Sequence, residues 1–379
     1  MTAVPTLSSL RQRVIMPRRH RPDLWLLMAT AGLVALGIVM IFNASYFYAQ
    51  DRYGDPFTFI RKHLVYLSIG VTVMVAVSRV RLEWFERAAR PLLLAFLALL
   101  ALVLVPGIGV VHGGARRWIG FGPLSFQPSE FAKTVVILYL AHSIARKREH
   151  MAQFSVGVLP HLIVVGLFVL LIGVQPDFGT AVILVSVLVF MLYGGGARLT
   201  HLVGLMLATL PVIAFALVHW PYRWKRILAF LEPMRYSQDI AFQLVQSLIA
   251  FGSGGLTGIG LGESKQKMFF LPEAHTDFIF ALIGEELGLW GALLVLVLFG
   301  ILGMRGFRVA SRHPDPFASA LAFGLTLVIL LEAVVNVGVV VGLLPTKGLA
   351  LPFLSYGGSA LIGTLLQVGM LAALSRMTG

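Results

Sequence analysis

Ten apolar stretches recur along this chain, and they restrict its possible folds more than any other feature. Each approaches, alone or with flanking residues, the roughly 20 residues that cross a bilayer as a helix. Inside hydrocarbon the backbone must satisfy its own hydrogen bonds, so continuous apolar runs predict helices. The runs are residues 24–46, 64–78, 91–111, 130–145, 159–174, 179–193, 200–219, 276–303, 317–343 and 352–375. The sequence therefore predicts an all-α polytopic membrane protein with ten transmembrane helices.

Composition supports this class and excludes others. Hydrophobic residues make up 58% of the 379 residues and charged residues only 12%, too few for the surface of a soluble protein. The chain contains no cysteine, which excludes disulfides and thiolate chemistry. The net charge of +13 is attributed to cytoplasmic loops and contacts with anionic membrane lipids. Because the sequence has no separate basic domain, we predict no nucleic-acid partner.

The distribution of Lys and Arg sets the predicted orientation. Residues 1–23 are basic and lack a cleavage-site pattern, so they are interpreted as a cytoplasmic tail. Short loops on the same side are enriched in basic residues, namely Arg79, Arg81, Arg87, Arg90, Arg146, Lys147, Arg148, Arg305, Arg308 and Arg312. Such loops mark the cytoplasmic side, so both termini are predicted to be cytoplasmic. Residues 24–376 then form one membrane domain, with a large extracytoplasmic loop at residues 220–275 between the seventh and eighth helices.

Unusual polar motifs fall together on the extracytoplasmic side of this topology. GGARRWIG (residues 113–120) and QPSEFAK (127–133) lie between the third and fourth spans, and QPDFGT (175–180) joins the fifth and sixth. PEAHTD (272–277) opens the eighth span, and LLPTKGLALPFLSYGGS (343–359) joins the ninth and tenth. Irregular backbone at membrane depth is tolerated where it is buried or lines a cavity. The clustering indicates a site at this face. Within the long loop, residues 242–251 are amphipathic and are predicted to lie along the membrane surface.

Several of these polar residues have a purely structural alternative. Glu130 and Lys133 are three residues apart on one helix and can pair with each other. Asp177 can cap the helix that starts near Phe178, because Asp is a favourable N-cap residue.

The remaining charges have alternatives of the same kind. Arg116, Arg117 and Lys347 can bind lipid phosphates without specificity. Glu332 is expected to be paired within the bundle, with Asn336 one turn further on. For all of these residues the structural and functional interpretations both remain open.

Three carboxylates, Asp277, Glu285 and Glu286, lie at or inside the eighth apolar stretch. A charge in a membrane segment costs about 2.5–3.5 kcal/mol or more, so such a group is usually paired, solvated or catalytic. Asp277 can alternatively cap the helix, and the two glutamates can hold the bundle together or contact Arg side chains. On a helix Glu285 lies about 12 Å along the axis from Asp277, and Glu286 faces almost the opposite way. Asp277 therefore acts alone or with other spans, and it is the candidate catalytic residue.

Taken together, these motifs resemble the SEDS family of bacterial membrane glycosyltransferases, which polymerise peptidoglycan. The resemblance covers residues 24–376 and is carried by GARRWI, FQPSEFAK, QPDFGTA, QSLIAFGSGGLTGIGLGESKQK, LPEAHTDFIFALIGEELG and NVGVVVGLLPTKGLALPFLSYGGS. PEAHTDFIF and GLLPTKG look more like the division branch, FtsW, than the elongation branch, RodA. At one position, His63, the family often has Gln. The resemblance implies a multi-pass protein of the bacterial cytoplasmic (inner) membrane.

The resemblance also implies a reaction. Its substrate would be lipid II, a disaccharide-pentapeptide on undecaprenyl pyrophosphate, and the family's catalytic aspartate in the HTD motif corresponds to Asp277. An inverting displacement needs one base, so Asp277 would take the proton from the acceptor 4-hydroxyl. Cationic groups would stabilise the departing pyrophosphate, and a divalent cation, Mg or Mn, could assist.

Candidate substrate-binding residues come from the same motifs. Arg116 and Arg117 rank first for the pyrophosphate, followed by Lys347. The full set is Arg116, Arg117, Trp118, Glu130, Lys133, Asp177, His275, Lys347 and Ser355. No residue is assigned as a metal ligand. The family usually works with a class B penicillin-binding protein, a transpeptidase, which is the expected protein partner.

Two other functions remain open from the sequence. A transporter of lipid II could use a cavity lined by charged side chains, which are Glu130, Lys133, Asp177 and Glu332. Against it, the polar residues gather at one face and the two halves show no obvious inverted repeat. A non-catalytic scaffold that activates a partner synthase is the third possibility. Glycan formation from lipid II by the purified protein separates an enzyme from both.

Overall fold

Helices occupy most of the computed structural model, which describes residues 21–112, 114–121, 124–219, 221–272 and 274–377. Each of the ten predicted stretches overlaps a helix. These helices are α1 (Leu24–Tyr53), α2 (Thr58–Val77), α3 (Leu82–Val103), α4 (Pro128–Arg146), α5 (Leu159–Val174), α6 (Phe178–Gly194), α7 (Leu199–His219), α10 (Ile279–Arg312), α11 (Pro316–Val340) and α12 (Gly358–Ser375). Residues 1–20 of the predicted cytoplasmic tail lie outside the described residues.

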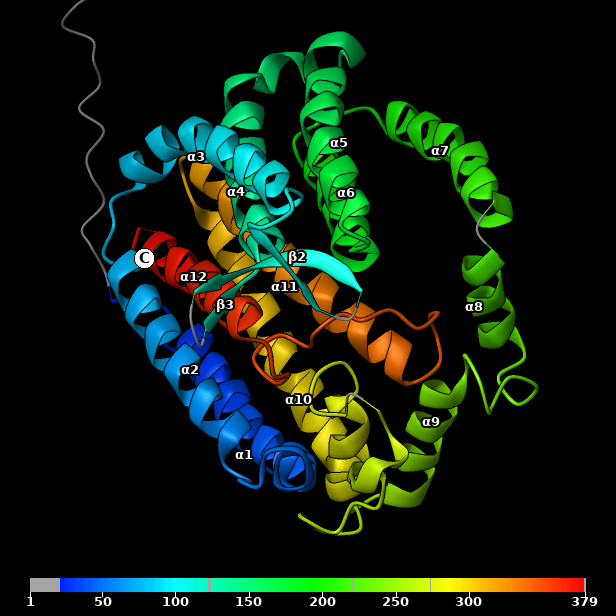
Figure 1. Ribbon diagram of the computed structural model, residues 1–379. Coiled ribbons are helices and arrows are strands. Elements are labelled where there is room, and N and C mark those ends of the chain that lie inside the picture. The colour runs from blue at the N-terminus through cyan, green and yellow to red at the C-terminus, as the bar shows by residue number, and fades with distance from the viewer. Residues whose placement is uncertain (1–20, 113, 122–123, 220, 273, 378–379) are drawn as a thin grey trace, which may run out of the picture.

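The centre of the bundle is formed by α11 and α12. Among the described residues, six helices are long and apolar enough to cross a membrane: α1, α2, α5 with the turn before it, α10, α11 and α12. Of these, α11 and α12 are the most enclosed, with 67% and 78% of their apolar windows buried. The helix α11 packs against α4, α6, α10 and α12, as Figure 1 shows. A helix surrounded in this way is apolar on all sides, and its polar residues need partners inside the protein.

The third predicted span is wrong at both ends. It was placed at residues 91–111, whereas α3 begins at Leu82 and ends at Val103. Arg87 and Arg90 therefore belong to the helix and not to a loop. The apolar run begins later than α3 because the first turns of α3 are amphipathic. In these turns Phe85 and Ala89 are buried, while the charged residues face outward.

The eighth span shows a similar error at its C-terminal end. The prediction ended it at residue 303, but α10 continues to Arg312 and includes Arg305 and Arg308. Arg305 pairs with Asp23, with 2.7 Å between Nε and Oδ2. Asp23 in turn caps α1 by accepting the N–H of Leu26 at 3.1 Å. The helix thus continues past its apolar core because its charged end docks on the start of α1.

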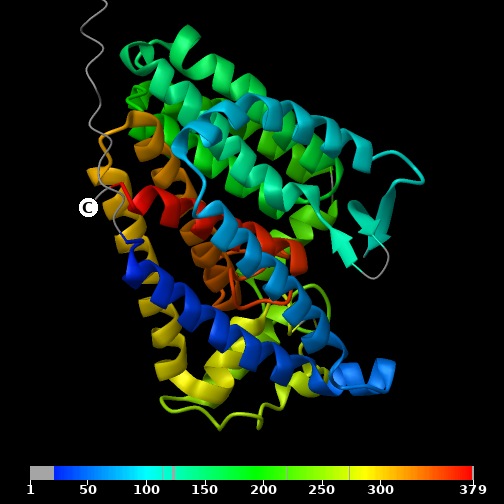
Figure 2. The same cartoon turned by 90° about the vertical axis from the view of Figure 1, so that its left-hand side faces the viewer.

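A small antiparallel sheet interrupts the helical fold, and the all-α prediction did not include it. It consists of β1 (Gly109–His112), β2 (Ala115–Phe121) and β3 (Leu124–Phe126), in the order β1-β2-β3. Figure 2 shows it projecting beyond the ends of α3 and α4. The N–H of Ser125 donates to the Tyr66 hydroxyl at 3.0 Å, and the Ser359 hydroxyl donates to the Ser125 carbonyl at 3.3 Å. These bonds fix the sheet to α2 and to the start of α12.

The long loop after α7 carries two helices, α8 (Pro221–Leu231) and α9 (Phe242–Gly254). The second matches the predicted amphipathic segment, and it packs against α10 and α11. Its Ser247 hydroxyl donates to the Val340 carbonyl at 2.6 Å. In Figure 1, α7 and α8 lie at the edge of the molecule. A position along the membrane surface stays a prediction for α9.

A break in α10 at Gly288 organises the glycine-rich part of this loop. Gly288 has φ 65° and ψ −159°, so the regular hydrogen-bond ladder is interrupted there. The carbonyls of Glu285 and Glu286 would accept, in a regular helix, from the N–H groups four residues later. They accept instead from Ile259 at 3.0 Å and Gly260 at 3.1 Å.

The N–H groups released by the break find partners in the same segment. Leu289 donates to the Gly255 carbonyl at 3.0 Å, and Trp290 donates to the Leu256 carbonyl at 3.3 Å. The segment GSGGLTGIG therefore takes over the hydrogen bonds of one helical turn. This exchange satisfies backbone groups that would otherwise be buried without partners.

Replacing Gly258 by alanine is expected to destabilise the folded protein by about 3 kcal/mol, since it adds left-handed strain and disrupts backbone hydrogen bonds. Gly258 has φ +81°, and a Cβ there would lie 2.0 Å from the Glu286 carbonyl oxygen. Gly262 is the matched control, because its φ is +89° but a Cβ would meet nothing within 4 Å. Thermal unfolding in detergent measures both variants. Equal losses for the two variants would show that the contact with α10 contributes nothing.

Candidate active site

Asp277 lies at the point where α10, α11 and the loop between α11 and α12 meet. Its carbonyl accepts the Asn336 side-chain amide at 2.9 Å, and the same amide donates to the Leu349 carbonyl at 2.6 Å. A Cβ on Gly348 would lie 2.8 Å from Asp277 Oδ2, so the carboxylate lies directly against the backbone of that loop. Phe278, and not Asp277, occupies the N-cap position of α10. The half-buried carboxylate is thus held in place by the end of α11 and by the loop.

His275 is enclosed by aromatic rings two residues before Asp277. Its ring centroid lies 5.5 Å from that of Tyr48, 4.9 Å from Phe59 and 5.9 Å from Tyr356. The His275 carbonyl also accepts the N–H of Tyr356 at 2.9 Å. The HTD segment is therefore anchored on both sides of the catalytic candidate, and a buried imidazole, 8% exposed, is one of the anchors.

The loop between α11 and α12 carries two other candidates, Ser355 and Lys347. The buried Ser355 hydroxyl accepts the N–H of Leu351 at 2.8 Å, which closes a turn of the loop. Lys347 is half-buried, and burial lowers the pKa of its ammonium group below the usual range. Next to it, the Thr346 carbonyl accepts a guanidinium N–H of Arg226 from α8 at 3.2 Å. The loop is thus fixed by its own turn and by α8 of the segment predicted to be extracytoplasmic.

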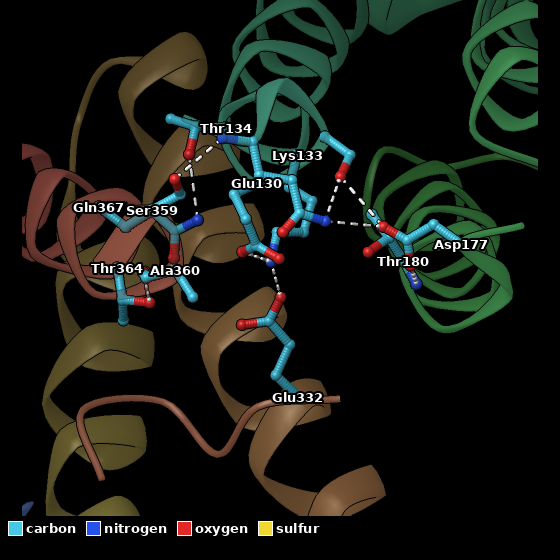
Figure 3. A network of polar contacts seen from close by, with 12 residues as sticks. Glu130, Lys133, Thr134, Asp177, Thr180, Glu332, Ser359, Ala360, Thr364 and Gln367 are labelled. Carbon is cyan, nitrogen blue, oxygen red and sulfur yellow. Dashed lines mark hydrogen bonds and ion pairs between the residues drawn. The ribbon is translucent and has the colours of Figure 1, made fainter. Parts of the chain in front are cut away.

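Lys133 forms a buried ion pair with two carboxylates (Figure 3). Its Nζ lies 2.6 Å from Glu130 Oε2 and also pairs with Glu332 Oε1. The predicted pairing of Glu130 with Lys133 is confirmed, as is the pairing of Glu332 within the bundle. Glu332 lies one turn before Asn336 on α11, so this cluster lies about 6 Å along the helix from the amide that holds Asp277.

Asp177 caps α6, as the structural alternative predicted. Its Oδ1 accepts the N–H of Thr180 at 3.2 Å, and its Oδ2 accepts the Ser129 hydroxyl at 3.0 Å and the Gln127 amide at 3.2 Å. The carboxylate is 4% exposed. These bonds join the start of α6 to the start of α4, a connection visible in part in Figure 3.

The start of α6 also reaches the loop that faces Asp277. A Cβ on Gly179 would lie 2.8 Å from the Leu349 side chain and 3.4 Å from the Gly348 carbonyl oxygen. On the opposite side, the Ser359 hydroxyl of α12 accepts the N–H of Gln127 at 2.9 Å. The N-terminal ends of α4, α6, α10 and α12 therefore gather around this loop. Helix N-termini carry partial positive charge and favour anions.

Glu285 and Glu286 form a second buried cluster, on α10 below the Gly288 break. Ser264 donates its hydroxyl to Glu285, and Lys267 Nζ lies 3.4 Å from Glu286 Oε1. Asn43 of α1 bonds both Glu286 and, at 2.6 Å, Lys267. These described partners are hydroxyl, amide and ammonium groups and not the Arg side chains considered as an alternative. Sequence reasoning missed Asn43, although a polar residue inside an apolar span is a signal of such a partner.

Arg116, Arg117 and Trp118 lie on β2 of the projecting sheet. A register shift opposite Arg117 breaks the regular alternation of side chains along β2. Trp118 pairs with Val110 and Arg116 pairs with Val111, so Arg116 and Trp118 lie on opposite faces of the sheet. The Arg116 side chain packs over Gly109, where a Cβ would lie 2.7 Å from its Cγ. Arg117 Nε is buried and has no hydrogen-bond partner within the described residues. The three residues thus form a group separate from the Asp277 anchor and connected to it through the start of α12.

Metal ligands do not gather at this site in the part of the chain that the structure describes. No group of three or more His, Asp or Glu side chains there has the arrangement of a metal centre. Asp277 and His275 alone do not provide the oxygen ligands that Mg²⁺ or Mn²⁺ prefers. The protein groups at this site thus fit a divalent cation poorly.

Comparison with known proteins decides the family. The family model for FtsW, RodA and SpoVE, described as cell cycle protein, matches residues 24–379. The chain belongs to the FtsW/RodA/SpoVE family. The probable peptidoglycan glycosyltransferase FtsW of Geobacter metallireducens is 44% identical over 361 residues, covering 95% of this chain and 96% of that protein. Stage V sporulation protein E of Bacillus subtilis is 41% identical over 359 residues, covering 95% and 98%.

Two solved structures share the fold. A chain from a peptidoglycan synthase complex that coordinates polymerization and crosslinking superposes with a TM-score of 0.79 at 31% identity, covering 94% of this chain and 98% of that chain. The rod shape determining protein RodA of Thermus thermophilus gives 0.68 at 30% identity, covering 94% and 97%. The resemblance to the SEDS family and to its FtsW branch is confirmed, and the chain is an integral membrane protein of helical fold.

Proposed function

We propose that this chain is a peptidoglycan glycosyltransferase that polymerises lipid II, with Asp277 as the general base. The observation that carries the proposal is the anchoring of Asp277. Its carbonyl is held by Asn336, and its carboxylate lies against Gly348 among four helix N-termini. A catalytic base must be fixed within hydrogen-bond reach of the proton it removes, and this arrangement provides such a base.

The reaction follows from the chemistry of the donor. The acceptor 4-hydroxyl oxygen attacks the anomeric carbon of the donor sugar while Asp277 takes the hydroxyl proton. The glycosidic C–O bond forms as the bond to the pyrophosphate oxygen breaks, and its electron pair leaves with undecaprenyl pyrophosphate. One displacement on an α-linked donor inverts the configuration and gives a β-1,4 linkage.

The leaving group gains negative charge, which the site is suited to stabilise. The helix N-termini of α10 and α12 supply partial positive charge, whereas Asp177 already caps α6 and Glu130 lies in the first turn of α4. Lys347 is a candidate cation for the pyrophosphate. Burial lowers the pKa of its ammonium group, and a bound pyrophosphate would raise that pKa again and so favour the charged form. Arg116, Arg117 and Trp118 on β2 are proposed to contact the substrate from the projecting sheet, with His275 and Ser355 positioning the site. Lys133 ranks below them, since Glu130 and Glu332 already neutralise it.

A transporter function receives less support from the geometry. The charged residues that could line a path for the lipid II headgroup already have partners inside the protein. Lys133 and Glu332 are each 4% exposed, and Asp177 accepts three hydrogen bonds within the protein. Opening such a path would break buried ion pairs at large cost. The enzyme is therefore preferred to the transporter.

Topology, location and partner complete the proposal. We infer ten transmembrane helices, cytoplasmic termini and an extracytoplasmic loop at residues 220–275, in the bacterial inner membrane. The enzyme would act at the outer face of that membrane in cell division or shape maintenance. A class B penicillin-binding protein is the proposed partner, which the match to a peptidoglycan synthase complex supports.

Reconstitution tests the function directly. The purified chain, with and without a cognate penicillin-binding protein, is incubated with lipid II, and glycan strands are resolved by gel electrophoresis. Strand formation by the chain is expected, because the site supplies both the base and the cationic surroundings. Movement of labelled lipid II across vesicles without strand formation would instead establish the transporter.

Gly348→Ala is expected to lower the polymerisation rate by about 10- to 100-fold, because its Cβ displaces the Asp277 carboxylate and misplaced catalytic groups lose rates of that size. The matched control is Gly357→Ala in the same loop. A Cβ there would meet only Ala360, at an ordinary 3.5 Å, so its rate should stay near wild type. Initial rates at saturating lipid II measure both variants. Equal rates for the two variants would contradict a role for the Gly348 contact.

A further inference from the structure

A cavity of about 710 Å³ lies at the opposite end of the bundle from Asp277. It is enclosed by the C-terminal ends of α4, α6 and α10 and by the first turns of α11. Most of α10 separates it from Asp277, which is about 40 Å along a helix axis. Its volume is that of a small-molecule or lipid site, and the catalytic groups do not extend to it.

Apolar side chains form most of the cavity wall. The larger of them are Ile144, Met191, Phe307, Pro314, Pro316 and Phe323. The Phe307 and Phe323 rings lie 5.6 Å apart at 42°, one from α10 and one from α11. Gly194 and Gly195 at the end of α6 leave the space beside these rings open. Such a wall accommodates a hydrocarbon chain.

One polar group in the wall has an unfilled hydrogen-bonding capacity. His313 Nδ1 accepts the N–H of Asp315 at 3.1 Å, which leaves the proton of a neutral ring on Nε2. Burial lowers the pKa of His313, so the ring is neutral near pH 7. The residue is 8% exposed, and Nε2 has no partner within the described residues. His313 lines the cavity, so its unpartnered N–H donor leaves a hydrogen bond open for an acceptor bound there.

Positive charge surrounds the same end of the bundle. Arg148 lines the cavity, and basic residues at the ends of α4 and α10 lie nearby in sequence, namely Arg146, Lys147, Arg308 and Arg312. The acidic residues of these turns, Glu149 and Asp315, are fewer. Basic pockets between transmembrane helices bind anionic lipid headgroups. A free phosphate has no hydrocarbon to place against the apolar wall, whereas a phospholipid does.

We propose that this cavity binds an anionic phospholipid, with its phosphate at Arg148 and His313 and an acyl chain against Phe307 and Phe323. The phosphate oxygens accept the His313 Nε2 proton and pair with the Arg148 guanidinium. The site would hold a lipid of the leaflet opposite to the catalytic face. It binds lipid as a ligand and contributes no group to the reaction at Asp277.

Native mass spectrometry of the full chain in detergent tests the charge recognition. Phosphatidylglycerol is titrated against phosphatidylcholine, and the wild type is expected to retain the anionic lipid preferentially. Arg148→Gln should weaken phosphatidylglycerol binding about fivefold, the effect of one basic residue near a charged lipid surface. Arg312→Gln removes the same charge from an exposed residue that does not line the cavity, so it should weaken binding much less than Arg148→Gln.

A second pair of measurements tests the position of the chain. Ala320→Trp fills the cavity and should weaken binding more than tenfold. Because that variant can fail to fold, wild-type protein is also photolabelled with phosphatidylglycerol carrying a diazirine on its acyl chain. Labels on peptides containing Phe307 or Phe323 support the site. Equal losses in Arg148→Gln and Arg312→Gln, labels confined to other helices, or equal competition by glycerol 3-phosphate would overturn it.

Discussion

Purified Asp277→Asn protein is expected to form glycan strands from lipid II at a rate at least about 100-fold below wild type. A general base contributes a factor of about 10² to 10⁴, and asparagine cannot accept the proton. Asparagine has nearly the same shape as aspartate, so the backbone bond to Asn336 and the packing against Gly348 should persist. Gel analysis of strands made from labelled lipid II measures the loss, and gel filtration with thermal unfolding checks the fold.

The matched control for this prediction is Asp239→Asn. Asp239 is an exposed carboxylate in the long loop that precedes Asp277, so its removal changes the charge equally without touching the site. Its strand-forming rate should match the wild type. An Asp277→Asn protein that extended glycan at the control rate would end the assignment of Asp277 as the base, whatever its stability.

Lys133→Met is expected to lower the free energy of unfolding by about 3–5 kcal/mol. Methionine keeps the length of the stem but leaves Glu130 and Glu332 buried together without their cation. Breaking a buried ion pair on one side has a cost of this size. Denaturation of the purified protein in detergent measures the change, with the yield of inserted protein as a second indicator.

Neutralising the two carboxylates as well should restore much of that stability. In the triple variant, Glu130→Gln and Glu332→Gln accompany Lys133→Met, so no uncompensated charge remains. Neutral replacements of buried ion pairs are often close to neutral in stability. A triple variant no more stable than Lys133→Met would show that the loss arises from packing of the stem and not from charge.

Helix positions could be predicted from the sequence because length and apolarity act locally. Every apolar run corresponds to a helix, including α5, whose bounds agree at both ends. Charged residues extend two helices beyond their apolar cores, at the start of α3 and the end of α10. Elsewhere the apolar run is longer than the helix: α3 ends at Val103 and not at residue 111, and α12 begins at Gly358 and not at residue 352. The sheet was missed because its strands are short and lie between a glycine-rich turn and a helix.

In the candidate site, only contacts between residues a few positions apart in the sequence could be predicted. The cap by Asp177 and the pair of Glu130 with Lys133 depend on residues three positions apart. The bond from Asn336 to Asp277 and the pair of Lys133 with Glu332 span distant helices, and single-sequence spacing does not encode such contacts. Likewise, the spacing of residues does not show that the glycine-rich segment exchanges hydrogen bonds with the broken α10.

The amide of Asn336 has a mechanical consequence. It bonds at once to the carbonyls of Asp277 and Leu349, so one side chain of α11 holds both the candidate base and the loop against which its carboxylate lies. A sliding or tilting of α11 would shift Asp277 and the loop together and preserve the contact between them. The distance between Asp277 and the loop therefore stays constant when α11 moves as a rigid body. Changes of conformation within the loop itself would alter that distance.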